Sequence, residues 1–334
     1  MRLTGRRPMS ELRWNAFLRE WLITATHRQD RTFLPPADYC PLCPTRPGHA
    51  STEIDRADFD IAVFENRFPS LRRSPERPSV EGSDLAPVRP SYGVCEVVVY
   101  TPRHDATLAD ASTEHIERLI AVWAHRTEAL GALEGVEYVF VFENKGEAIG
   151  VTLSHPHGQI YAYPYLPPLI DREVGAAALH PADHGACLWC EVQEQELADG
   201  RRIVAQNDDW VAGVPFAARW PYEVHLVSRR HMGWLHELGT GERRALAEIL
   251  GSLLRGYDRL FGFSLPYIMA IHQRPTGSAP SDDYHLHLEF YPPNRTETKL
   301  KYLAGSEAGA GAFINDTLPE ETAPRLRAAI EGLS

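Results

Sequence analysis

The sequence predicts an α+β fold built from two tandem copies of one unit, each a mostly antiparallel sheet with flanking helices. Three features occur in both halves in the same order: a Cys-x-x-Cys pair, a strand followed by a long helix, and a strand that carries two histidines. Corresponding features are offset by roughly 130 to 147 residues. We therefore expect an N-terminal unit at residues 1–175 and a C-terminal unit at residues 176–334.

The bulk composition is that of a globular protein and argues against two classes of function. With 334 residues, 43% apolar and 24% charged, the chain can bury one or two cores. A net charge of −11 argues against a nucleic-acid binder and against a membrane-surface protein. No apolar run approaches the roughly 20 residues that cross a bilayer, and no apolar segment follows the basic first residues as it would in a signal peptide.

Four of the five cysteines form the pairs Cys40/Cys43 and Cys187/Cys190. A chain without an export signal is expected in the reducing cytoplasm. Paired cysteines there are more often metal ligands or redox groups than structural disulfides. The fifth, Cys95, lies within an apolar run and is expected to be a buried strand residue.

Hydrophobic periodicity and turn residues place the elements of both units. Apolar residues from Trp14 to Leu22 have helix-like spacing, although a strand beginning at Trp21 fits the same stretch. The rest of the N-terminal unit is expected as strand 61–64, exposed loop 70–92, strand 94–101, helix 107–131, strand 138–142 and a connector at 164–186. The C-terminal unit repeats this order with strands near 205–210 and 223–228, a helix at 240–261, and strands at 267–272 and 284–290.

The most informative stretch is Ser154–Ile160, which we expect to be an extended strand. Alternate side chains of a strand share a face, so His155, His157 and Gln159 point the same way. Gly158 lets another group approach the backbone beside His157. Two imidazoles and an amide on one face fit a metal site, a nucleophile with a phosphate-binding partner, or one of each.

Histidines recur with both cysteine pairs in positions that complete a metal site. Two thiolates from a tight turn and two imidazoles from strand ends give the tetrahedral ligand set of structural zinc. The first set is Cys40, Cys43, His104 and either His155 or His157, and the second is Cys187, Cys190, His231 and His285. If His155 binds the first zinc, His157 can attack phosphorus and Gln159 can donate its amide to a phosphate oxygen. We expect this division, with His155 in the metal site and His157 in the reaction.

The run Phe142-Glu143-Asn144-Lys145-Gly146, then Gly150, then His155-Pro156-His157-Gly158-Gln159 resembles the galactose-1-phosphate uridylyltransferase family, a branch of the histidine-triad superfamily. The Cys40/Cys43 pair, Pro102-Arg103-His104, Trp220-Pro221-Tyr222-Glu223 and Tyr291-Pro292-Pro293 fall in the matching order, so the resemblance spans nearly the whole chain. It implies two histidine-triad-like units and a double-displacement reaction. His157 would take the uridylyl group from UDP-glucose, release glucose 1-phosphate, and pass the group to galactose 1-phosphate.

The resemblance also implies roles for further residues. Gln159 would hydrogen-bond the transferring phosphoryl group. Asn144, Gly150 and Thr152 would line the nucleotide site, Asn66 and Phe68 would lie near the uridine, and Arg28, Arg31 and Lys301 would contact phosphates. A homodimer is implied as well, because in the family the partner subunit completes the site.

Two departures from the family pattern bear on the C-terminal unit. Some members build a second metal site from a glutamate and three histidines; Glu173, His272 and His287 match three of these positions, and Glu289 replaces the fourth. The set Cys187/Cys190/His231/His285 is therefore the first choice for a second zinc, and Glu173/His272/His287/Glu289 is the alternative. Glu289 also stands where the first unit has Gln159. A carboxylate there would repel phosphate, so the C-terminal unit is expected to be catalytically silent.

The sequence leaves two further alternatives for the function. One is a related nucleotidyltransferase such as an ADP-sugar phosphorylase; these enzymes tend to have Ser at the position of Gly158, which favours the uridylyltransferase. The other is a zinc-stabilised nucleotide-binding protein without catalytic activity. The residue that distinguishes glucose 1-phosphate from galactose 1-phosphate has no signature in the sequence.

Overall fold

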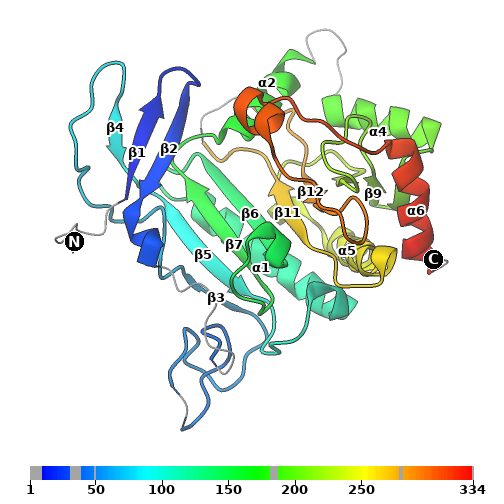
Figure 1. The fold of residues 1–334 in the computed structure, drawn as a ribbon, viewed down its shortest axis with the longest axis horizontal. Helices are drawn as coiled ribbons and strands as arrows, with labels where there is room; N and C mark the ends of the chain where they lie inside the picture. Colours follow the sequence, from blue (N-terminus) through cyan, green and yellow to red (C-terminus); the bar gives the residue numbers. More distant parts are fainter. Residues whose placement is uncertain (1–9, 31–38, 49, 181–186, 278–280, 333–334) are drawn as a thin grey trace.

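A computed structural model describes residues 10–30, 39–48, 50–180, 187–277 and 281–332. Within these residues, strands from both halves form one nine-stranded antiparallel sheet (Figure 1). From edge to edge its strands are β3 (Ala62–Glu65), β5 (Val94–Val99), β7 (His157–Tyr163), β6 (Tyr138–Lys145), β11 (Tyr267–His272), β12 (His287–Tyr291), β10 (Val224–Ser228), β9 (Trp210–Gly213) and β8 (Ile203–Gln206).

The two halves meet where β6 pairs with β11, with Val141 opposite Ile271. β6 and β11 are corresponding strands of the two predicted units. The order of strands on one side of this pair therefore matches the order on the other side. β7 then corresponds to β12, β5 to β10, and β3 to β9. The units therefore share one sheet instead of each having its own. This pairing leaves neither β6 nor β11 with an unpaired edge.

One face of the sheet is apolar and covered by long helices. Val139 and Val141 of β6 and Leu226 of β10 belong to one buried cluster with α1 (Thr113–Gly131), α5 (Thr240–Phe261) and α6 (Pro319–Glu331). The N-cap of helix α1 is Ser112, whose side chain accepts a hydrogen bond from the N–H of His115. This face holds the main core.

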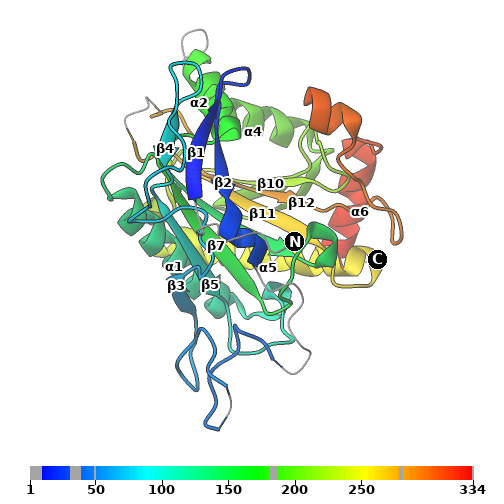
Figure 2. The same cartoon turned by 60° about the vertical axis from the view of Figure 1, so that its left-hand side comes forward.

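The opposite face carries the other side chains of the same strands. There α2 (Pro168–Leu179) packs Ile170 and Val174 against Tyr138, and α4 (Leu188–Asp199) adds Trp189 to the same cluster. A small sheet of β2 (Glu20–Ala25), β1 (Ser10–Asn15) and β4 (Val88–Pro90) packs on this face through Leu12 (Figure 2). By strand alternation, His157, Gln159, His287 and Glu289 all lie on this second face.

Short turns connect these elements. They are 3-10 turns at Thr26–Asp30, Leu108–Asp110, Glu147–Ile149 and Leu235–Glu237, and a π turn at Gly305–Gly309. Among the described residues, no helix has both the length and the apolarity required to span a bilayer.

The helix considered for Trp14–Leu22 is wrong, because these residues form the β1–β2 hairpin. Trp14 and Trp21 are cross-strand partners, with ring centroids 5.3 Å apart. Large apolar residues that pair across a hairpin can thus have the same spacing in the sequence as residues on one face of a helix. The alternative, a strand that includes Trp21, is confirmed.

Other boundaries also differ from expectation. The loop at 70–92 contains β4, the connector at 164–186 contains α2, and the strand of the central stretch begins only at His157. Cys187 is the N-cap of α4, so the second cysteine pair lies at a helix start and not in a turn like that of Cys40. The helix expected at 107–131 is a 3-10 turn followed by α1. The predicted helix 240–261 and strand 267–272 match α5 and β11 at both ends.

Candidate active site and metal centres

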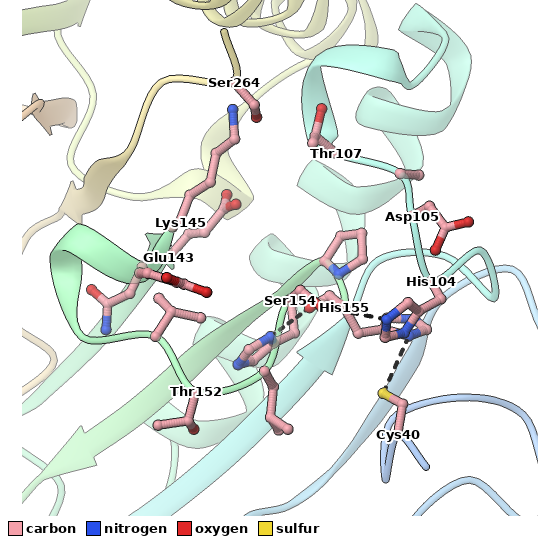
Figure 3. Close-up of a pocket in the computed structure, with 18 of the residues that line it drawn as sticks. Cys40, His104, Asp105, Thr107, Glu143, Lys145, Thr152, Ser154, His155 and Ser264 are labelled. Atoms are coloured by element: carbon pink, nitrogen blue, oxygen red, sulfur yellow. Dashed lines mark hydrogen bonds between the residues drawn. The ribbon is translucent and has the colours of Figure 1, made fainter. Parts of the chain in front are cut away.

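A cavity of about 580 Å³ opens where β6 ends and β7 begins. Among the predicted site residues, those that line it are Cys40, His104, Asn144, Thr152, His155 and His157. Figure 3 shows Cys40, His104 and His155 together on one side, with Thr152 and Lys145 on the other. The first cysteine–histidine set and the predicted nucleotide residues therefore border the same cavity.

The two histidines of the central stretch have different environments. His155 precedes β7 and is buried, and its Nε2–H donates to the Thr101 carbonyl oxygen at 2.7 Å. This bond leaves Nδ1 as the acceptor nitrogen, 3.6 Å from Cys43 Sγ and 3.8 Å from Cys40 Sγ. His157 instead donates Nδ1–H to the His155 carbonyl oxygen at 2.8 Å, so its Nε2 carries the lone pair of the neutral ring.

The first cysteine–histidine set has the geometry of a tetrahedral zinc site. The ligand atoms of Cys40, Cys43, His104 and His155 all lie within 4.8 Å of one another. Cys43 Sγ is 3.6 Å from both His104 Nδ1 and His155 Nδ1. Zn–S bonds of about 2.3 Å and Zn–N bonds of about 2.0–2.1 Å at tetrahedral angles give sulfur–nitrogen separations of about 3.5–3.6 Å. The set therefore fits zinc with His155, not His157, as the fourth ligand.

The second cysteine–histidine set repeats this geometry. The ligand atoms of Cys187, Cys190, His231 and His285 also lie within 4.8 Å of one another. His285 Nδ1 is 3.7 Å from Cys187 Sγ and 3.5 Å from Cys190 Sγ. The Nε2 of His285 lies 2.9 Å from the Ser228 carbonyl oxygen, which orients the ring as Thr101 orients His155.

The electrostatics of both sets also suit a bound cation. Burial and the neighbouring Cys40 raise the pKa of Cys43 to about 11, and burial together with Cys187 raises the pKa of Cys190 to about 12. Burial lowers the pKa of His285 to about 3, so this imidazole is neutral. A bound zinc ion would supply the positive charge that stabilises two thiolates beside neutral imidazoles.

The alternative ligands for a second metal form a third and separate group. Atoms of Glu173, His272, His287 and Glu289 lie within 4.8 Å of one another, on the same face of the sheet. His272 Nδ1 is 3.0 Å from Glu173 Oε2. The cysteine set and this set occupy different places, so they do not compete for one ion.

Protein groups already neutralise the carboxylate of Glu289 in this third group. The Tyr291 hydroxyl donates to it, His225 Nε2 lies 3.2 Å away, and Arg219 Nη2 lies 3.4 Å away. Burial alone would lower the pKa of His225, but Glu289 and Glu223 outweigh it and the pKa is raised. Glu289 is thus part of a buried ion-pair network that needs no metal for charge balance.

Two donors on one atom fix the orientation of Gln159. Asn66 Nδ2 donates to Gln159 Oε1 at 3.2 Å, and the Tyr161 hydroxyl donates to the same oxygen at 3.3 Å. Arg28 in turn donates to the Tyr161 hydroxyl at 3.3 Å. Because both neighbours use Oε1, the NH₂ group of Gln159 is the part that can donate to an anionic ligand.

The remaining predicted substrate residues do not all lie near the cavity or Gln159. The N–H of Phe68 donates to Asn66 Oδ1 at 2.9 Å, next to Gln159. Gly150 ends the 3-10 turn before the central stretch with a φ of 81°, which favours glycine. Lys301 does not line the cavity; it is buried in the C-terminal half, where its ammonium contacts a carboxylate at 2.9 Å. Arg31 lies outside the described residues.

Sequence reasoning missed one titratable group at the cavity. Glu143 lines it and is buried, and burial raises its pKa to about 7, although Lys145 opposes the shift. The neighbouring phenols of Tyr100 and Tyr267 also oppose this shift. The available signal was a glutamate that directly follows the apolar run 138–142 within the same strand.

Gly158 is required by the packing of the helix-covered face. A Cβ at this position would lie 2.2 Å from the Tyr100 hydroxyl oxygen and 3.0 Å from the Phe142 carbonyl oxygen. Tyr100 is fully buried and cannot move aside. Gly158→Ala should therefore lower the free energy of unfolding by about 1–3 kcal/mol, seen as a lower Tm.

The matched control for this substitution is Gly175→Ala in helix α2, where an added Cβ meets no atom within 4 Å. Alanine favours a helix over glycine, so this variant should keep or raise the Tm. Equal Tm values for the two variants would contradict the predicted clash at Gly158.

Comparison with known proteins agrees with this geometry. The family described as galactose-1-phosphate uridyl transferase, N-terminal domain, matches residues 2–167, and the corresponding C-terminal domain matches residues 175–332. The galactose-1-phosphate uridylyltransferase of Thermotoga maritima is 40% identical over 322 residues, which cover 96% of this chain and 98% of that protein. The chain belongs to the galactose-1-phosphate uridylyltransferase family.

Other members of the galactose-1-phosphate uridylyltransferase family are similar in sequence and fold. The enzyme of Rattus norvegicus is 35% identical, covering 95% of this chain and 86% of that protein. A solved structure described as a uridylyltransferase has a TM-score of 0.86 and 37% identity, covering 96% and 99% of the two chains. An ADP-glucose phosphorylase from Arabidopsis thaliana shares the fold, with a TM-score of 0.72 and 23% identity over 96% and 98% of the two chains. The resemblance predicted from the central motif is therefore confirmed.

Proposed function

We propose that this protein is a UDP-glucose–hexose-1-phosphate uridylyltransferase that exchanges the uridylyl group between UDP-glucose and galactose 1-phosphate through a covalent uridylyl-histidine. The observation that carries this proposal is the different placement of two neighbouring imidazoles. His155 Nδ1 lies 3.6 Å from a cysteine of the first metal set, whereas His157 lines the cavity with its Nδ1–H held by a carbonyl at 2.8 Å. Two relatives named for this activity, matched over 98% and 86% of their lengths, support it.

His157 Nε2 is the nucleophile of the proposed first step. It forms a bond to the α-phosphorus of UDP-glucose while the bond to the bridging oxygen breaks and glucose 1-phosphate leaves. A phosphate oxygen of galactose 1-phosphate then attacks the same phosphorus, the P–N bond breaks, and UDP-galactose leaves. The carbonyl of His155 accepts from Nδ1–H at 2.8 Å throughout, which stabilises the positive charge on the uridylylated imidazole.

Gln159 supplies the hydrogen bond to the transferring phosphoryl group. Its Oε1 accepts from Asn66 and Tyr161, so its NH₂ is oriented before substrate binds. A donor aimed at charge that develops in the transition state typically contributes about 10²–10³ in rate. In the C-terminal half Glu289 takes this place with a carboxylate, which supports a catalytically silent second unit, residues 176–334.

The nucleotide would bind along the cavity and the adjoining strand face. Asn144 and Thr152 line the cavity, and Gly150 ends the turn beside them. Asn66 and Phe68 lie beside Gln159 and are assigned to the uridine. Arg28, linked to this network through Tyr161, is assigned to a phosphate.

A homodimer would be needed for the phosphate contact predicted for Lys301, which lies away from the cavity of its own chain. Its ammonium is bound to the Glu307 carboxylate at 2.9 Å, so this ion pair would have to open for Lys301 to reach a phosphate of the partner's site. The chain that follows it exposes large apolar side chains, with Tyr302 73% and Ile314 57% exposed, as an interface would require. A cytoplasmic location is proposed because four of the five cysteines belong to the two cysteine–histidine sets, and paired cysteines of this kind are typical metal ligands in a reducing compartment.

One structural zinc ion is assigned to each cysteine–histidine set. The residues that would hold them are Cys40, Cys43, His104 and His155, and Cys187, Cys190, His231 and His285. The ions supply rigidity and positive charge to the loops and strand ends that they join. In the first set this fixes His155, whose carbonyl holds the ring of His157.

The test is isotope exchange between UDP-glucose and labelled glucose 1-phosphate in the absence of galactose 1-phosphate. A double displacement predicts exchange, because the first half-reaction runs both ways. ADP-glucose with inorganic phosphate as acceptor is the matched comparison, and turnover there but not with UDP-glucose would favour an ADP-sugar phosphorylase. Binding of UDP with no exchange of any donor would indicate a nucleotide-binding protein without this activity.

A further inference from the structure

The face of the sheet that carries His157 and Gln159 continues into the C-terminal half with corresponding register. In the first half Val97 is the β5 partner of Gln159, and in the second half His225 is the β10 partner of Glu289. The next strand outward places Phe64 opposite Val97 and Gly213 opposite His225. The two halves can therefore be compared position by position.

This comparison shows a face that is filled in one half and hollow in the other. In the first half Phe64, Val97 and Val99 pack with Leu42 and Ile54. In the second half Gly213, His225 and Val227 line a cavity of about 280 Å³ together with residues of α4. Gly213 has no side chain where the first half has the phenyl ring of Phe64.

The walls of this second cavity are aromatic and aliphatic. They include Trp189 and Val192 of α4, Val211 of β9, and Phe216 after β9. Phe216 is 75% exposed and Val192 is 47% exposed, so the cavity is open to solvent between them. Such walls suit a flat ring that stacks on one aromatic side chain.

The polar groups of the cavity suit a ligand with N–H and ring-nitrogen or carbonyl groups. Gln193 donates its Nε2 to the carbonyls of Val227 and Ser228 at 3.4 and 3.3 Å, which leaves its Oε1 to accept from a ligand. His225 uses Nε2 for Glu223 and Glu289 at 2.9 and 3.2 Å, so Nδ1 is the nitrogen that can meet a ligand.

The charges around the cavity disfavour a phosphate. Two carboxylates, Glu223 and Glu289, lie directly behind His225. Glu196 lines the cavity, and the nearby Arg202 is already bound to it at 2.8 Å. The volume of this cavity also lies just below the range of about 300–1,000 Å³ that is typical of small-molecule sites. The cavity is therefore too small for a nucleotide sugar.

We propose that this cavity binds an unphosphorylated nucleoside or nucleobase, at a site separate from the catalytic cavity. The base would stack on Phe216 at the mouth, with its edge toward Gln193 and His225. The proposal does not depend on the uridylyl-transfer reaction, because no residue of this cavity belongs to the catalytic site.

The test is equilibrium dialysis of uridine and adenosine against the full-length, zinc-loaded protein with UDP-glucose present in saturating amounts. We expect one nucleoside per chain that UDP-glucose does not displace. Phe216→Ala should weaken this binding about tenfold, as expected for loss of one base–aromatic stack, and Val192→Trp should block it by filling the cavity. Phe17→Ala is the matched control, because Phe17 is 99% exposed and lies at the tip of the β1–β2 hairpin.

Three outcomes would overturn the proposal. They are complete displacement of nucleoside by UDP-glucose, equal nucleoside affinity in Phe216→Ala and Phe17→Ala, and a change of oligomeric state in Phe216→Ala measured by light scattering. The last would show that the face is an interface between subunits. Isotope exchange should be unchanged in all three variants. Failure of exchange in the unmodified protein would therefore contradict the proposed reaction but not the proposed nucleoside site.

Discussion

Replacing His157 by alanine should abolish covalent labelling of the protein by UDP-glucose carrying ³²P in the α-phosphate. The substitution removes the only group that the proposed first step uses as a nucleophile, and turnover should fall by about 10⁴-fold or more. The fold should be retained, because His157 is half-buried at the edge of the cavity and does not belong to the apolar core. Acid-labile, base-stable label on the unmodified protein would identify a phosphoramidate.

The control for this experiment is His125→Ala, which removes an exposed histidine of helix α1. It should label and turn over like the unmodified protein. Stoichiometric labelling of the His157→Ala variant would contradict the proposed mechanism. Equal loss of label in both variants would show that the effect is not specific to the cavity.

Replacing Cys43 by serine should remove one zinc ion per chain and strongly destabilise the N-terminal half. Structural zinc sites contribute several kcal/mol to folding, and about 1 kcal/mol corresponds to roughly 2–4 °C in Tm for a domain of this size. We therefore expect a fall in Tm of about 10 °C or more. Activity should fall as well, because His155 holds the ring of His157 through its carbonyl. Metal analysis and calorimetry provide the measurements.

Two further cysteine variants make this result specific. Cys190→Ser should also remove one zinc, but from the C-terminal set, and the chain should keep its first zinc. Cys95→Ala is the control, because Cys95 is buried outside both sets and its loss should leave the zinc content unchanged. Two zinc ions retained by Cys43→Ser would refute the assignment of the first set.

Sequence patterns were sufficient to predict features that depend on neighbouring residues or that occur in both halves of the chain. The two Cys-x-x-Cys pairs and their histidines predicted two sets that the structure brings within ligand distance. Helix 240–261 and strand 267–272 were predicted at both ends because each has an uninterrupted pattern and a clear terminator, such as Gly262 after α5. The hairpin at β1–β2 was ambiguous, because cross-strand tryptophans imitate a helix face.

Contacts between distant segments decided the rest. The residue pattern allowed either His155 or His157 in the first metal set, and the predicted division of roles assigned His155 to the metal and His157 to the reaction. The geometry that supports this assignment depends on the Thr101 carbonyl, which lies just after β5 and accepts a hydrogen bond from His155 Nε2–H at 2.7 Å. The orientation of Gln159 depends on Asn66, 93 residues away along the chain. The hydrophobic periodicity of a single segment cannot predict contacts between segments that are far apart in the sequence.

The sequence by itself determined the ligand types, the nucleophile candidates and the two-fold order of elements, because these depend on residue identity and spacing along the chain. Only the tertiary structure decided that the halves share one sheet through β6 and β11, that the alternative second metal sets are two different places, and that one half has a hollow face. The physical reason is that pairing edges, converging ligands and cavities are produced by backbone and side-chain contacts across long sequence separations.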